Sequence, residues 1–75
     1  MHGYADIDGD SGIAAYELGR DVIVIRFKQG GTYRYDASAP GANHVRRMQK
    51  LARAGRGLNE YNNRHVREKF AAKLD

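Results

Sequence analysis

The chain has 75 residues, a formal net charge of +4 and no cysteine. A chain of this length forms one small domain, and the lack of cysteine excludes disulfides and thiolate zinc sites. The longest apolar run, residues 22–25, is far short of the roughly 20 residues that cross a bilayer, and the N-terminus lacks a secretion-signal pattern. We therefore expect a soluble cytoplasmic protein.

The first ten residues form an acidic segment without lysine or arginine, which we expect to be mobile; residues 11–75 form the domain. Together with Glu17, its aspartates have the spacing of an EF-hand calcium loop. However, Ser11 occupies the position where that loop needs glycine, and no flanking helix is predicted. Calcium binding is therefore a minor alternative, with candidate ligands Asp6, Asp8, Asp10 and Glu17. No other metal and no cofactor is predicted.

The next part of the chain predicts three strands joined by two turns. Alternating apolar and β-branched residues favour strands over residues 12–18, 21–28 and about 32–36. Glycines mark both turns, the first at residues 19–20 and the second within residues 29–31. We expect an antiparallel meander.

The first turn determines which residues share the apolar face of this sheet. With the turn at residues 19–20, Tyr16 pairs with Ile23 and Ala14 pairs with Ile25. Because side chains alternate along a strand, one face then carries several apolar residues. These residues are Ala14, Tyr16, Ile23, Ile25 and Phe27, and we expect them to face the core.

The length of the second turn decides where Tyr33 and Tyr35 point. A two-residue loop pairs Tyr33 with Arg26 or Lys28 and places both rings away from the apolar face. A three-residue loop over residues 29–31 buries the rings on the core side. Two-residue loops with glycine are the commonest hairpin turns, so we favour exposed rings and keep the buried arrangement as the alternative.

Two helices follow the strands. Ser38 is a candidate N-cap for a helix that includes Pro40 in its first turn and runs to about residue 54. Its apolar stripe consists of Val45, Met48 and Ala52, with Leu51 beside it.

The second helix is predicted to begin with Asn62 or Asn63 as its cap and to run towards Leu74. Spacing of four residues puts Val66, Phe70 and Leu74 on its buried side. The predicted fold class is therefore α+β: a three-stranded antiparallel β-meander followed by two helices packed on one face (β-β-β-α-α).

A longer residue pattern connects these elements: Ile23-x-Ile25-x-Phe27-x-x-Gly30-x-x-Tyr33-x-Tyr35, then a proline, an amphipathic helix, Ala54-x-x-Gly57 and Tyr61-x-Asn63-x-x-Val66-Arg67-x-x-Phe70. This pattern resembles the KTSC domain, which is named for the C-terminus of some lysyl-tRNA synthetases and also occurs alone in small bacterial proteins. The resemblance covers about residues 11–72. It implies the same fold and no established activity, and attachment to a tRNA enzyme suggests RNA binding.

The cationic residues concentrate in the second half of the chain. Residues 44–73 contain nine lysines and arginines against only Glu60 and Glu68. Such asymmetry favours a polyanionic partner, although a solvated helical surface is the plain alternative.

These features together predict a small non-catalytic module that binds RNA or another single-stranded nucleic acid. Bases stack on exposed rings for roughly 1–3 kcal/mol each, while lysine and arginine neutralise phosphates. The predicted surface consists of Tyr33, Tyr35, Arg26, Lys28, Arg46, Arg47, Arg53, Arg56, Arg64 and Arg67. The alternative is a protein-interaction module that uses the same aromatic patch or an exposed sheet edge.

No pattern in the sequence indicates an enzyme. The histidines, His2, His44 and His65, do not complete a metal-ligand set. No nucleophile turn, catalytic triad or phosphate-binding glycine loop is present.

Overall fold

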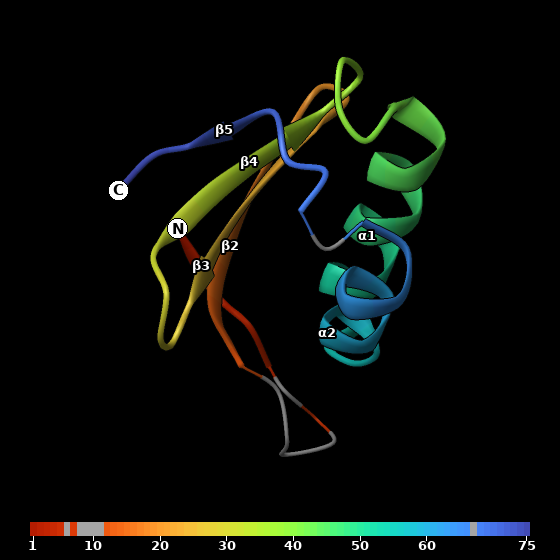
Figure 1. The fold of residues 1–75 in the computed structure, drawn as a ribbon. Helices are drawn as coiled ribbons and strands as arrows, with labels where there is room; N and C mark the ends of the chain where they lie inside the picture. Colours follow the sequence, from red (N-terminus) through yellow and green to blue (C-terminus); the bar gives the residue numbers. More distant parts are fainter. Residues whose placement is uncertain (6, 8–11, 67) are drawn as a thin grey trace.

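The computed structural model describes residues 1–5, 7, 12–66 and 68–75. These residues form a small α+β domain in which helices cover one face of an antiparallel sheet (Figure 1). The sheet has five strands in chain order: β1 (His2–Gly3), β2 (Ile13–Gly19), β3 (Val22–Phe27), β4 (Thr32–Asp36) and β5 (Ala72–Lys73). The helical layer contains α1 (Ala42–Ala54), α2 (Leu58–Tyr61) and the π-helical turn η1 (Asn62–Val66). No helix in the described ranges combines the length and apolar character needed to cross a membrane.

The α+β class and the three central strands are confirmed, but the predicted number of strands is too small. A two-residue strand extends the sheet at each edge. In β1, His2 pairs with Tyr16, and in β5, Lys73 pairs with Tyr33. Two residues are too few to carry an alternating pattern, so neither edge strand has a signal of its own.

Residues 2–4, which sequence analysis assigned to the N-terminal segment, belong to the sheet and the core. β1 continues into Tyr4, whose side chain is only 8% exposed. The backbone N–H of Tyr4 donates to the Ala14 carbonyl at 3.1 Å, and that of Ile7 donates to the Gly55 carbonyl at 2.7 Å. This segment therefore links the sheet to the end of α1.

The first hairpin turns one residue later than predicted. Gly19 pairs with Val22, which leaves Arg20 and Asp21 as the two-residue loop. Asp21 has φ of 55°, a left-handed conformation that aspartate tolerates better than most residues. The later turn pairs Tyr16 with Ile25 instead of Ile23, a shift of two residues that keeps Tyr16 on the predicted face.

The prediction of a two-residue loop in the second hairpin is wrong. The N–H of Phe27 donates to the Gly31 carbonyl at 3.0 Å, so the loop consists of residues 28–30. Gly30 and Gly31 have φ of 117° and 94°, which suits glycine. In this register Tyr33 lies opposite Ile25 and Tyr35 opposite Ile23. Both tyrosines therefore share the face covered by the helices.

The core lies between that face and the helical layer. Ile23, Ile25 and Tyr35 from the sheet are no more than 1% exposed. The predicted stripe of α1 packs against them and is confirmed by the burial of Val45, Met48 and Ala52. Leu58 and Val66 complete the core from α2 and η1.

Helix α1 ends where predicted but begins later. Gly55 adopts a left-handed conformation at its C-terminus, and its N–H donates to the Leu51 and Ala52 carbonyls. Ser38 is not the N-cap, because its N–H and hydroxyl donate to the Asp36 carboxylate in the preceding turn. A cis Ala39–Pro40 bond follows, and Gly41 occupies the N-cap position.

A second helix is present as predicted, but its predicted bounds, residues 62–74, are wrong. Helix begins earlier, at Leu58, passes into η1, and gives way to β5. The N–H groups of Ala71 and Leu74 donate to the Arg34 and Thr32 carbonyls of β4, both at 2.7 Å. The segment therefore supplies hydrogen-bond donors to the backbone carbonyls of β4, a strand far away in the sequence. Local helix propensity does not indicate such long-range pairing. Leu74, predicted to be buried, is 52% exposed.

Candidate functional site

An aromatic groove lies between the β3–β4 hairpin, β5 and η1. Its volume is about 840 Å³. Side chains that line it include Phe27, Tyr33, Tyr35, Asn62, Phe70 and Lys73. Strand register explains part of this arrangement, because Lys73 in β5 pairs with Tyr33 in β4. The groove therefore depends on the chain leaving the helical layer after η1.

Three half-buried rings form one continuous cluster in the aromatic groove. The centroids of Phe27 and Tyr33 are 5.8 Å apart at an interplanar angle of 72°. Those of Tyr33 and Phe70 are 4.6 Å apart at 55°. The Lys73 Nζ atom lies 5.8 Å from the Tyr33 ring centroid, within cation–π range. The groove thus combines ring surfaces with a cationic group.

Tyr35 and Asn62 contribute polar groups to the same groove. Tyr35 is 1% exposed, and burial raises the pKa of its hydroxyl; the nearby Asn62 amide opposes this rise and Tyr33 adds to it. Asn62 is 4% exposed. Its amide is close enough to favour the ionised hydroxyl, yet among the described residues Nδ2 has no hydrogen-bond partner of acceptable geometry. A buried donor is thus left unsatisfied at the groove.

A second depression, the helical hollow, also includes residues of η1. It is formed by α1, α2 and η1, has a volume of about 210 Å³, and is lined by Arg47, Leu51, Tyr61, Arg64 and His65, among others. The Tyr61 hydroxyl and the His44 Nδ1 atom are 2.7 Å apart, and the His65 ring lies 4.6 Å from the Tyr61 ring. Arg64 also contacts Glu60 at 3.5 Å, with both side chains exposed.

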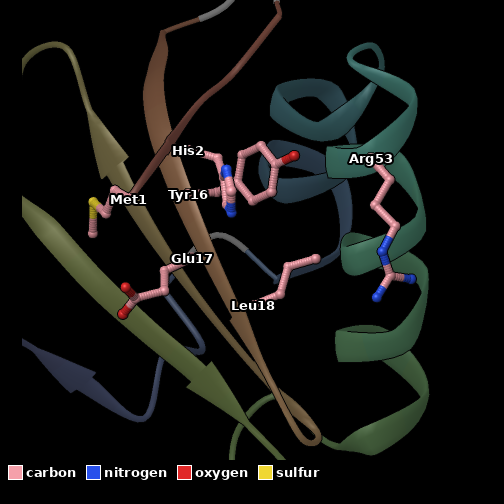
Figure 2. Close-up of a pocket in the computed structure, with 6 residues that line it drawn as sticks. All are labelled: Met1, His2, Tyr16, Glu17, Leu18 and Arg53. Atoms are coloured by element: carbon pink, nitrogen blue, oxygen red, sulfur yellow. The ribbon is translucent and has the colours of Figure 1, made fainter.

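A third depression, the edge hollow, lies where β1 and β2 face α1 (Figure 2). In Figure 2 the Arg53 side chain runs along α1, and the Tyr16 ring lies beside His2 on the sheet. The centroids of these two rings are 5.9 Å apart. Glu17 points away from the helices in the same view. This hollow combines an arginine with aromatic rings at the edge opposite the aromatic groove.

The structure separates the predicted site residues. Tyr33 lies in the aromatic groove, but Tyr35 is buried and has no exposed ring face for stacking. Arg26 alternates onto the opposite face of the sheet, which the helices leave uncovered, and Lys28 is in the hairpin loop. The predicted cluster of Tyr33 and Tyr35 with Arg26 and Lys28 is therefore wrong. The three-residue loop places the two tyrosines on the sheet face that the helices cover, opposite to the face of Arg26.

The predicted helical arginines are exposed and occupy several positions. Arg47 and Arg64 line the helical hollow, and Arg53 lines the edge hollow. Arg46 lies 3.7 Å from the Asp21 carboxylate, and Arg56 lies between α1 and α2. Arg67 lies outside the described residues.

Several groove residues were not predicted as functional from the sequence. Phe70 was assigned to a helix core and Asn62 only to a helix cap. Lys73 was counted among the basic residues without a position. No local signal marks these residues as neighbours, because β5 brings them together through pairing with β4.

The predicted calcium ligands are only partly described. Asp6, Asp8 and Asp10 lie outside the described residues. Glu17 lies within β2, where it pairs with Val24, so it does not belong to a calcium-binding turn. In the described ranges, no group of three or more His, Cys, Asp or Glu residues is arranged to hold a metal ion.

Neither protein-family models, curated proteins nor solved structures match this chain. The resemblance to the KTSC domain stays a prediction from the residue pattern. The function is therefore inferred from the residues of the chain itself.

Proposed function

We propose that this protein binds single-stranded nucleic acid, with RNA as the preferred ligand. The observation that carries this proposal is the cluster of Phe27, Tyr33 and Phe70 in the aromatic groove beside Lys73. Half-buried rings keep part of their surface accessible while packing fixes their positions. Such rings stack on unpaired bases, whereas the bases of a duplex already stack on each other.

The turn η1 connects this groove to cationic residues. Asn62 and Asn63, at its start, line the aromatic groove, and the next residues, Arg64 and His65, line the helical hollow. Arg47 from α1 adds a second guanidinium there. A strand with a base in the groove thus has a route for its phosphates along η1. Phosphate neutralisation by arginine supplies much of the affinity of such complexes.

The chain-wide charge and the resemblance support the same ligand. The net charge of +4 favours association with polyanions. The KTSC-like pattern suggests RNA because that domain is attached to a tRNA enzyme. The surface proposed here differs from the one expected from sequence: Phe27, Phe70 and Lys73 replace Tyr35 and Arg26.

The test measures binding of fluorescently labelled oligouridylate of roughly ten nucleotides by anisotropy at several salt concentrations. We expect affinity to fall steeply as salt rises. The double variant Arg47→Gln/Arg64→Gln should weaken binding and reduce the slope of log K against log salt by about 1.4, since each lost contact contributes about 0.7 for a single strand.

The matched control is Arg20→Gln/Arg26→Gln, which removes the same charge from a hairpin turn and the uncovered sheet face. Equal weakening by both double variants would contradict the proposed surface and indicate only overall attraction. Absence of salt-sensitive binding at low salt would contradict nucleic-acid binding altogether. Salt-insensitive capture of a protein would instead support the protein-interaction alternative.

A further inference from the structure

Asn62 provides an unsatisfied hydrogen-bond donor at the aromatic groove. The residue is 4% exposed, and its Nδ2 atom makes no hydrogen bond of acceptable geometry with the described residues, although the amide lies near the Tyr35 hydroxyl. Buried amide groups are nearly always paired, because removing them from water without a partner is costly. An unpaired donor that lines a groove is therefore a candidate ligand contact.

The surroundings of Asn62 restrict the chemistry of that ligand. Phe27, Tyr33 and Phe70 offer ring surfaces, which favour a planar aromatic group. Tyr35 lies beside Asn62, and its hydroxyl is protonated at neutral pH because the ordinary tyrosine pKa is about 10; burial raises this pKa further. The groove therefore presents donors to a ligand carbonyl near Asn62.

One acidic side chain also lines the groove. Glu68 is exposed and belongs to the segment between η1 and β5. Its carboxylate accepts hydrogen bonds, so it matches a ring N–H next to a carbonyl. Among the RNA bases, uracil and guanine present a carbonyl beside a ring N–H. Cytosine and adenine do not.

We propose that the aromatic groove holds one unstacked uracil or guanine, stacked on the ring cluster, with the Asn62 Nδ2 atom donating to its carbonyl oxygen. This inference rests on the proposed nucleic-acid binding and adds base selectivity to it. The groove volume of about 840 Å³ lies within the range of about 300–1,000 Å³ found for small-molecule sites. Lys73 at the Tyr33 ring supplies a positive charge for the adjoining phosphate.

The first experiment compares oligouridylate with oligocytidylate of equal length, because both bases are pyrimidines of the same size that differ in the groups at ring positions 3 and 4. Wild type should prefer oligouridylate by roughly five- to 100-fold, the range of one well-formed base contact. Asn62→Asp replaces the donor by an acceptor and should abolish this preference. Asn43→Asp, the control, makes the same change at an exposed residue of α1 that lies outside the groove. It should retain the preference.

A second measurement on the wild-type chain decides the matter if Asn62→Asp does not fold. In ¹H–¹⁵N spectra, the side-chain amide signal of Asn62 should shift on addition of uridine monophosphate and remain in place on addition of cytidine monophosphate. Equal, salt-sensitive binding of both oligonucleotides with an unmoved Asn62 signal would overturn base selectivity and leave the proposed function intact. Absence of binding to either would overturn both.

Discussion

The Tyr4 hydroxyl oxygen accepts a hydrogen bond from the backbone N–H of Leu58 at 3.2 Å, which joins the N-terminal segment to the first residue of α2. Free N–H groups at the start of a helix need such acceptors. Tyr4→Phe should therefore lower the free energy of unfolding by about 1–2 kcal/mol, measured by urea denaturation. Tyr61→Phe is the control, because water can replace its half-exposed bond with His44. An equal loss in both variants would contradict this explanation.

Among the glycines at the helix ends, Gly55 is predicted to lose the most stability on substitution by alanine. It has φ of 77°, and an added Cβ would lie 2.8 Å from the Ala5 Cβ and 3.2 Å from the Ile7 Cδ1 atom. Gly55→Ala should cost about 1–3 kcal/mol through backbone strain and displacement of the N-terminal segment. Gly3→Ala, where an added Cβ meets nothing within 4 Å, should change the melting temperature little.

The contact between Asp75 and Thr32 stabilises the junction of β5 with β4. The Asp75 carboxylate accepts from the Thr32 N–H at 2.6 Å and from its hydroxyl at 3.3 Å. Asp75→Ala leaves this buried N–H without its acceptor and should cost about 1–3 kcal/mol in chemical denaturation. Asp75→Asn retains an acceptor oxygen and should cost less. Failure of Asp75→Ala to speed amide exchange in β4 would contradict the proposed role.

Asp36 makes the free energy of unfolding depend on pH in the acid range. The Ser38 hydroxyl hydrogen bond is the largest cause of the lowered pKa of Asp36, and backbone N–H groups and Arg34 act in the same direction. A lowered folded-state pKa gives stability that is fully present above the unfolded-state value of about 3.9 and is lost as pH falls through the folded-state value. Ser38→Ala should therefore raise the Asp36 pKa, measured by carboxyl NMR titration.

The acid-unfolding midpoint provides a second measurement of the same effect. It should move to higher pH in Ser38→Ala than in wild type, because the folded state then favours the carboxylate less strongly. Asp36→Asn removes the titrating group and serves as the control. The same pH dependence in wild type and Asp36→Asn would show that other carboxylates dominate acid unfolding.

The sequence predicts those parts of the fold that local patterns determine. Alternation located the three central strands, and the spacing of Val45, Met48 and Ala52 located α1 and its buried side. Gly55 marked the end of that helix because a left-handed residue commonly follows a helix. These features each depend on a few neighbouring residues.

The remaining errors have two causes. Some come from interactions between residues distant in the sequence, and others come from turns and loop lengths that differ little in energy. A left-handed Asp21 moved the first turn, and the three-residue loop moved Tyr33 and Tyr35 to the covered face. β5 forms because β4 has an edge to pair, which overrides helix propensity over residues 68–74. The same errors affect the predicted site. Tyr33 was identified from the sequence, but Asn62 and Phe70 lie near it only because β5 pairs with β4.

The π-helical turn η1 has a consequence for how this protein can vary in length. A π-helical turn spans five residues between the bonded carbonyl and N–H groups, one more than an α-helix, so it accommodates one additional residue. Deleting a residue within Asn62–Val66 would restore an α-helix and rotate the following chain by about 100°, the angle per α-helical residue. Phe70 and Lys73 would then no longer meet Tyr33. Homologues should therefore conserve the number of residues between Leu58 and β5 more strictly than the identity of the exposed Asn63.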